Sequence, residues 1–237
     1  MGQILNLLFY QPIFNLLVAV YSLVPNLGWT TILVTLLIRF LMWPWYRKNA
    51  RLQRQLSLIQ PKIKEIQKKY KDDPQQQMKE LSNLYRLEKV NPLGMILFLL
   101  VQIFVLLALF KDIGLILAHK GSEFLYPFVS HKEITNYLFL SIDLSQPHFL
   151  LALLAALTQY LQSWLMLRRQ KKLTSQNPQI LNQTVMFYLM PLLVFFLYLK
   201  LPAVLALYWL IMTIVSIVQD LIVWRESVRI AVGNGQN

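Results

Sequence analysis

Long stretches of uncharged apolar residues limit what this chain can fold into. Hydrophobic residues make up 56% of its 237 residues, whereas charged residues make up only 14%. Soluble domains are nearer to ~25% charged. Several of the apolar stretches approach the ~20 residues that cross a bilayer as a helix. We therefore expect an all-α membrane protein whose core is the bundle of its own transmembrane helices.

The predicted transmembrane helices follow from the apolar stretches. Five are expected, at 28–46, 92–112, 148–168, 184–200 and 201–224. The last two are separated by so short a turn around Pro202 that they should form a tight helical hairpin. Polar residues interrupt the apolar run at the N-terminus, so we favour an interfacial helix on the outer face over 1–27, with a sixth span over 4–24 as the alternative.

Basic residues are concentrated in one loop, and this predicts the orientation of the chain. The segment 46–91 carries twelve Lys and Arg against five acidic residues, whereas 111–147 carries three Lys against four acidic residues. Short loops rich in Lys and Arg stay in the cytoplasm. We therefore expect an N-out, C-in topology, with an extracytoplasmic loop at 113–147, a cytoplasmic loop at 169–183 and a cytoplasmic tail at 225–237.

The basic segment 47–91 has the pattern of a cytoplasmic antiparallel helical hairpin. Apolar residues between Leu52 and Tyr70 recur at heptad spacing, which indicates a first helix, and Pro61 should kink it near 57–61. A second helix should follow the turn at 71–74. The remaining alternative is that the charges only mark a solvated helix face.

The second helix of this hairpin has a recognisable start. Asp73 can cap it, with Pro74 at the first helical position and Gln76 completing a capping box. The expected apolar face of the helix consists of Met78, Leu81 and Tyr85.

Arg39 lies inside the first predicted span, and 28–45 holds no acidic residue to neutralise it. A guanidinium does not lose its proton, and placing one at mid-depth costs roughly 2.5–3.5 kcal/mol on insertion scales. Plain snorkelling is the alternative, but Arg47 marks the cytoplasmic edge about eight residues on, or roughly 12 Å of helical rise. Arg39 therefore needs water, a partner or a function.

Polar residues on other spans could line one hydrated cavity with Arg39. Thr31 and Thr35 precede it at a spacing of four and so share its helix face. Ordinary helix–helix hydrogen bonding is the alternative role for each candidate. The further candidates are Gln102 in the second span, Gln159 and Gln162 in the third, and Trp209, Thr213 and Ser216 in the fifth.

Enzyme signatures are missing from the sequence. Cysteine is absent, and the histidines His119, His131 and His148 fall at the outer loop. There is no zinc-protease helix motif, nucleophile elbow or phosphate-binding glycine loop. We expect no metal and no cofactor. A small transporter or channel with Arg39 as an anion site, and a non-catalytic assembly factor, stay as rival hypotheses.

The order of motifs resembles the YidC-type membrane protein insertases of the YidC/Oxa/Alb family. The resemblance runs from about Tyr21 to Asp220 and rests on the intramembrane Arg39, on QPKIKEIQKKYKDDP at 60–74, on VNPLG at 90–94 and on LPAVLALYW at 201–209. The chain departs from the family at Val204, where many members have a small residue, and in the weakly basic tail, which argues against a tail-mediated ribosome contact. It is expected to be a single-core member without a large periplasmic domain or a lipid-modified cysteine.

The resemblance implies a function as well as a fold. It implies a five-span core in the bacterial cytoplasmic (inner) membrane, with a groove open to the cytoplasm and to lipid. Arg39 maps to the groove arginine, which would attract acidic translocated segments, and Gln102 maps to a groove glutamine. Nascent membrane proteins and the lipid bilayer are the implied partners, with the ribosome and the Sec translocon as further candidates and no specific nucleic acid. Insertion involves no covalent chemistry, so no enzyme activity is expected. The hairpin is implied to receive substrate, and its candidate residues are Arg51, Arg54, Lys62, Lys64, Lys68 and Lys69.

Overall fold

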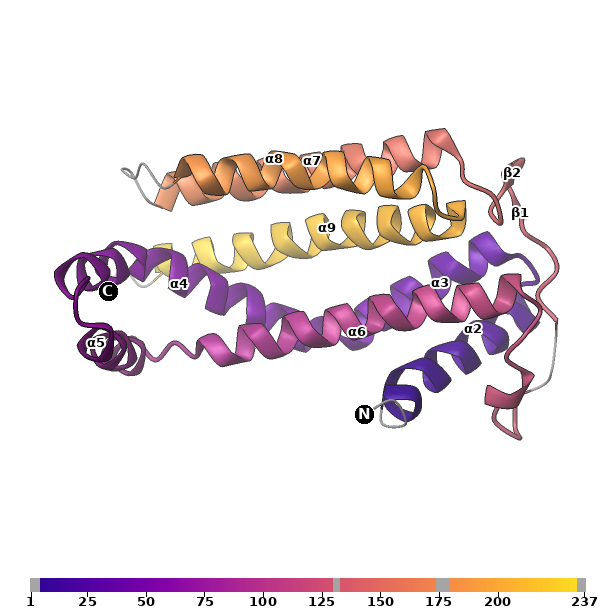
Figure 1. Cartoon of the computed structure of the whole chain (residues 1–237), viewed down its shortest axis with the longest axis horizontal. Coiled ribbons are helices and arrows are strands. Elements are labelled where there is room, and N and C mark those ends of the chain that lie inside the picture. Colours follow the sequence, from indigo (N-terminus) through magenta and orange to yellow (C-terminus); the bar gives the residue numbers. More distant parts are fainter. Residues whose placement is uncertain (1–4, 130–132, 174–179, 234–237) are drawn as a thin grey trace.

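Long helices lie side by side in the protein, with little other regular structure (Figure 1). A computed structural model describes residues 5–129, 133–173 and 180–233. Its elements in chain order are η1 (Asn6–Tyr10), α2 (Gln11–Leu23), α3 (Leu27–Leu41), α4 (Trp43–Lys69), α5 (Pro74–Leu87), α6 (Pro92–Leu117), η2 (Ser122–Phe124), β1 (Leu138–Phe139), β2 (Ile142–Asp143), α7 (Phe149–Leu173), α8 (Ile180–Tyr198) and α9 (Ala203–Gly233).

The all-α membrane fold class is confirmed. Within the described residues, four helical stretches are long and apolar enough to cross a membrane, namely Asn6–Leu23, Pro92–Leu117, Phe149–Arg168 and Ala203–Arg225, and the bent pair α3–α4 would make a fifth. This set differs from the expected one, because it includes the N-terminal segment, whereas the described apolar part of α8, Tyr188–Tyr198, is short. Length and composition do not distinguish a spanning α2 from an interfacial one, so the interfacial helix stays a prediction.

The helices are arranged around α9. It lies between α3 on one side and the α7–α8 pair on the other, and α6 contacts α2, α4 and α9 (Figure 1). The α4–α5 hairpin lies at one end of the bundle, and the β1–β2 hairpin lies at the opposite end (Figure 1). Two membrane-length helices start at side-chain caps, since Asn26 accepts the amide hydrogens of Gly28 and Trp29, and Asn91 accepts that of Leu93.

The first predicted span breaks earlier than expected. Instead of continuing to residue 46, α3 ends at Leu41 and the chain bends by 64° into α4. Pro44 explains the break, because it has no amide hydrogen for the carbonyl of Phe40 and its ring clashes with that carbonyl. α4 is helical through Pro61, where the predicted kink stays a prediction, and the 64° bend lies at Met42.

Several helix ends also lie beyond the predicted boundaries. α6 continues past residue 112 to Leu117, and α9 continues through most of the predicted tail to Gly233. The apolar face of α6 continues past residue 112, since Ile113 and Ile116 are 1% and 5% exposed in the main core. Residues 174–179 of the expected loop at 169–183 lie outside the described residues.

The helical hairpin has a small core of its own. Ile59, Ile63, Leu84 and Val90 are buried together, so the heptad stripe of α4 is confirmed. Met78 was a wrong choice for the apolar face of α5, because it is 74% exposed and Leu84 takes the buried position.

The predicted start of α5 is only partly correct. The Asp73 carboxylate accepts the Gln76 amide hydrogen at 3.0 Å, which confirms the cap. The Gln76 side chain donates to Glu80 instead of returning to residue 73, while the Asp73 amide bonds the carbonyl of Tyr70. The reciprocal capping box was therefore wrong.

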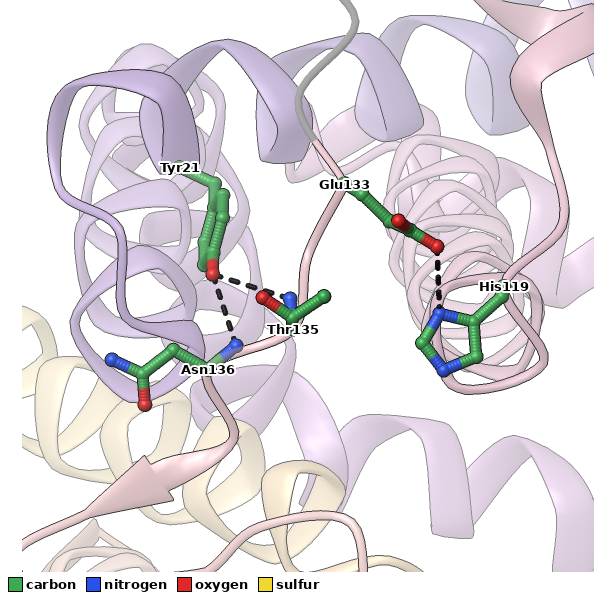
Figure 2. Close-up of polar contacts among 5 residues, drawn as sticks. All are labelled: Tyr21, His119, Glu133, Thr135 and Asn136. Atoms are coloured by element: carbon green, nitrogen blue, oxygen red, sulfur yellow. Dashed lines mark hydrogen bonds and ion pairs between the residues drawn. The ribbon is translucent and has the colours of Figure 1, made fainter.

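The loop at 113–147 is fastened to the N-terminal helix by buried side chains. The Tyr21 hydroxyl accepts the amide hydrogens of Thr135 and Asn136 at 3.2 and 3.0 Å (Figure 2). Asn15 donates to the carbonyl of Phe124 and accepts from the amide of Tyr126. These bonds join segments more than a hundred residues apart, so this end of the protein is held by specific contacts to α2.

We predict that Tyr21→Phe will loosen this loop without unfolding the bundle. Two backbone amides lose their acceptor, and each buried unpaired donor costs roughly 1–3 kcal/mol. Hydrogen exchange at Thr135 and Asn136 should therefore speed up about tenfold or more, since ~1.4 kcal/mol corresponds to a factor of ten. The control is Tyr160→Phe, which removes a hydroxyl from a half-exposed side chain on α7. Equal exchange in both variants would contradict the role of Tyr21.

Candidate functional site

Arg39 points into the protein interior. Its side chain is 9% exposed, and it lies in a partly open pocket with Thr35, Gln102 and Tyr208. The pocket is lined further by Ile38, Met42 and Val105, and the space between these residues is about 240 Å³, including what lies open at its mouth. The pocket therefore forms where α3, α6 and α9 meet, in the part of the bundle made by membrane-length helices.

The groups nearest to Arg39 are polar but do not neutralise it in a close ion pair. The guanidinium carbon lies 5.9 Å from the centre of the Tyr46 ring, a distance at which a cation and an aromatic face attract. Asp220 is near enough to act on Arg39 electrostatically. Its carboxylate accepts the Tyr46 hydroxyl at 2.6 Å. Within the described residues, no carboxylate forms a salt bridge with Arg39, so its charge remains open to a ligand at the pocket.

The two threonines on the Arg39 face have a structural task. The Thr31 hydroxyl donates to the carbonyl of Leu27 at 2.8 Å, and the Thr35 hydroxyl donates to that of Thr31 at 2.6 Å. Both side chains are 2% exposed. Their hydroxyl hydrogens are therefore used inside α3. Their small size leaves room beside Arg39, and Thr35 alone of the two lines the pocket.

Several buried polar atoms of α4 and α9 have no hydrogen-bond partner in the described protein. In the described chain they include the Thr213 hydroxyl, the Gln219 Oε1 and the Asn49 Oδ1. Gln219 also donates its side-chain nitrogen to the carbonyl of Arg39, at 3.5 Å. Buried polar groups are nearly always hydrogen-bonded, to protein or to water. Each of these atoms is therefore a candidate to bind water, and among them Gln219 Oε1 belongs to the side chain that bonds the Arg39 carbonyl.

The other predicted groove residues separate into two places. Gln102 lies at the Arg39 pocket and donates to the sulfur of Met212 at 3.3 Å. Gln159 accepts the indole hydrogen of Trp209 at 3.1 Å, which joins α7 to α9 away from that pocket. Gln162 is half-buried on α7, and the Ser216 hydroxyl bonds the Met212 carbonyl within α9. Of the nine predicted groove residues, Arg39, Thr35 and Gln102 line this pocket, and a wider groove that includes the others stays a prediction. The residues outside the pocket lining are Thr31, Gln159, Gln162, Trp209, Thr213 and Ser216.

Tyr46, Tyr208 and Gln219 were missed by sequence reasoning. On α9, Tyr208 lines the Arg39 pocket, Met212 bonds Gln102 of that pocket and Gln219 bonds the Arg39 carbonyl. Tyr208 and Met212 each precede by one residue a predicted candidate, Trp209 and Thr213. Gln219 could have been recognised from the sequence, since an uncharged side-chain amide within an apolar span needs a hydrogen-bond partner.

The basic residues of the hairpin differ in their surroundings. Lys62 forms an ion pair with Glu88 at 2.6 Å, which joins the end of the hairpin to α4. The guanidinium of Arg54 lies 5.0 Å from the centre of the Trp224 ring, which connects α4 to α9. Arg51, Lys68 and Lys69 are exposed, and Lys64 is half-buried. Of the six candidate cations, Lys62 therefore joins the two helices of the hairpin, and Arg54 holds the hairpin against the bundle.

We predict that Arg54→Ala will free the hairpin from the end of α9. A partly desolvated cation–aromatic contact contributes about 1–2 kcal/mol, so its loss should raise the undocked population about five- to thirtyfold. The chain has no cysteine, so spin labels can be placed at Leu58→Cys and Val218→Cys, two exposed positions on α4 and α9. Arg54→Ala should broaden the distance distribution between them, whereas Lys68→Ala should leave it unchanged. Two identical distributions would show that the contact does not hold the hairpin.

Comparison with known proteins identifies the family. Residues 19–229 match the family described as 60Kd inner membrane protein. Three relatives carry the name membrane protein insertase YidC. The one from Nitratidesulfovibrio vulgaris is 32% identical over 92% of this chain, the one from Wolinella succinogenes is 30% identical over 91%, and the one from Francisella tularensis subsp. novicida is 32% identical over 92%. The chain spans 38%, 37% and 36% of the length of these relatives. With its membrane-length helices, the chain is a multi-pass inner membrane protein, and it belongs to the 60Kd inner membrane protein family, the YidC/Oxa type.

Proposed function

We propose that this chain inserts nascent membrane proteins into the bilayer, with Arg39 attracting the acidic segment that must cross. The observation that carries the proposal is a buried guanidinium in a bundle of membrane-length helices, with no salt bridge to it in the described part of the chain. The insertase names of the relatives support the same activity. No cofactor enters the scheme.

The physical task is to move a short polar segment across hydrocarbon. Burying each unpaired peptide-like group costs roughly 2–7 kcal/mol, so even a few residues in lipid make an unaided crossing slow. A water-filled groove that reaches Arg39 would shorten the distance that the segment travels without hydration. The unpartnered Oε1 of Gln219, whose side-chain nitrogen donates to the Arg39 carbonyl, supports such a groove, since water would satisfy it.

Arg39 would act by attracting negative charge transiently. Two opposite charges about 4 Å apart attract by about 4 kcal/mol at an effective dielectric constant near 20. Asp220 already holds a hydrogen bond from Tyr46, so a substrate carboxylate would not have to displace a tight Arg39–Asp220 pair. The attraction stays reversible because the segment regains full hydration on the far side.

Release of the apolar part of the substrate would be sideways into lipid. Apolar side chains are exposed along α3, α6, α7, α8 and α9, including Leu33, Leu97 and Leu192. Moving apolar surface out of water releases about 25 cal/mol per Å², which favours partition of a hydrophobic helix into lipid beside these faces. No nucleotide is required, because folding and partition of the substrate supply the free energy.

The hairpin of α4 and α5 would receive the substrate on the cytoplasmic side. The excess of Lys and Arg in this segment supports an N-out, C-in orientation. Arg51, Lys68 and Lys69 present exposed positive charge to an arriving chain, while Arg54 and Lys62 set the position of the hairpin. The ribosome and the Sec translocon are further proposed partners on the same side.

We predict that Arg39→Ala will impair insertion according to the charge of the translocated segment. Loss of the cation should remove ~1.4 kcal/mol or more of attraction for an acidic segment, which corresponds to a factor of ten. Insertion of substrates with acidic segments should therefore fall about tenfold or more, and insertion of neutral ones by less than about threefold. Arg39→Lys should keep part of the activity because it retains the charge. The measurement is protease protection of matched substrates in proteoliposomes. Equal losses for acidic and neutral substrates would point to a structural role.

We predict that the pocket is reached by water from the hairpin side only. Gln102→Cys places a thiol at the pocket, and a membrane-impermeant maleimide should label it from that side. Ile103→Cys, one residue along and 40% exposed on the apolar surface, is the control and should stay unlabelled, because a thiol in lipid does not ionise. Labelling of Gln102→Cys from the opposite side would favour the rival transporter or channel.

A further inference from the structure

The β1–β2 hairpin presents apolar side chains outward. Leu138 is 60% exposed and Leu140 is 76% exposed, whereas Phe139 between them is 7% exposed. Side chains alternate along a strand, so Phe139 points inward and Leu138 points away. No residue of the described chain covers the outward pair.

The hairpin sits directly on the first turn of α3. A methyl group at Gly28 would lie 2.3 Å from the ring of Phe139, so the Phe139 side chain packs directly on the backbone of α3. The Trp29 ring packs edge-on against Phe139, with ring centres 5.4 Å apart. β1 is therefore fixed to α3 by a contact that only glycine permits.

Segments on both sides of the hairpin bond the starts of two membrane-length helices. The amide of Leu27 at the start of α3 donates to the carbonyl of Asn136 at 3.0 Å. The amides of Ala203 and Val204 at the start of α9 donate to the carbonyls of Gln146 and Leu144, at 2.9 and 3.1 Å. The hairpin therefore lies level with the N-terminal ends of α3 and α9, at the end of the bundle opposite α4 and α5 (Figure 1).

The turn of the hairpin holds a leucine in an unfavourable backbone conformation. Leu140 and Ser141 have φ values of 48° and 67°, in the left-handed region. Two-residue turns of this kind favour Asn-Gly, since a bulky side chain is disfavoured at positive φ. Backbone strain of this kind persists at sites where the exposed side chain has a use. Leu140 projects from the tip with three quarters of its surface uncovered.

We propose that the tip of the β1–β2 hairpin is seated in the boundary between lipid headgroups and acyl chains, with the lipid bilayer as its partner. Continuity with the lipid-facing surface favours lipid as the occupant. Trp29 and Leu33 on α3 are 49% and 42% exposed, and Phe149 at the start of α7 is 62% exposed. Tryptophan is enriched at this level of a membrane protein.

Asp143 limits how deeply the hairpin enters. It lies directly opposite Leu138 in the strand pair. Its carboxylate accepts the hydroxyl and the amide hydrogens of Ser145 at 2.7 and 2.9 Å. These bonds lower the pKa of Asp143, so it is ionised at neutral pH and must remain among headgroups and water. The tip at Leu140 therefore lies deeper than the end of the strands, as in an interfacial wedge.

A fluorescent probe at residue 140 tests the proposal directly. Leu140→Cys gives the cysteine-free chain a single labelling site. In nanodiscs with nitroxide on the upper acyl chain of the lipid, bimane at 140 should be quenched several-fold more than at Glu123→Cys, an exposed polar position in the same loop. Its quenching should approach that of Leu33→Cys on α3. Quenching at 140 equal to that at 123 would overturn the proposal.

A second variant separates lipid contact from folding. Replacing Leu140 by Asn and Ser141 by Gly suits the turn, so the midpoint of thermal unfolding in detergent should stay unchanged or rise. Bimane at Leu138→Cys should lose at least half of its lipid quenching in that background. Undiminished quenching would show that Leu140 does not hold the hairpin in lipid. Photocrosslinking from 140 to nascent chains, with no quenching by lipid, would assign the surface to a substrate instead.

Discussion

The burial of an arginine within the helix bundle is the constraint on which much of this structure depends. A guanidinium in hydrocarbon is stable only where aromatic faces, carbonyl groups or water surround it. The bend between α3 and α4 supplies part of that environment, because it carries Tyr46 to the guanidinium and its hydroxyl to Asp220. α9 supplies Tyr208 and Gln219. The proline that ends α3 is thus a functional element of the site.

The two ends of the bundle are held in different ways. At the end with the β-hairpin, backbone amides of two helices and buried side chains of α2 fasten the connecting loop. At the other end, α4 and α5 share a small core of their own and contact the bundle through a few groups such as Arg54. Small separate cores and few anchoring contacts favour independent motion. This difference between the two ends agrees with the proposed function, in which substrate arrives at the α4–α5 end.

Local chemistry allowed much of this to be predicted from residues alone. The apolar runs gave the all-α membrane class, the heptad spacing gave the buried stripe of α4, and Asp73 marked the start of α5. The Arg39 face was also predictable, because residues four apart on a helix share a side. The break at Met42 could have been foreseen from Pro44. The resemblance to insertases rested on ordered motifs, and the family match confirms it.

The existence of the long apolar helices, the Asp73 cap, the charge of each loop and the place of Arg39 within an apolar helix were thus determined by the sequence itself, since they depend on neighbours within a few residues. Which face of α6 and α9 turns inward was decided only by tertiary packing. Both helices are apolar on nearly every side, so their composition contains little directional information. As a result Gln102 lies at the Arg39 pocket, Gln159 pairs with Trp209 elsewhere, and Tyr208 takes the place that the predicted stripe had given to its neighbour.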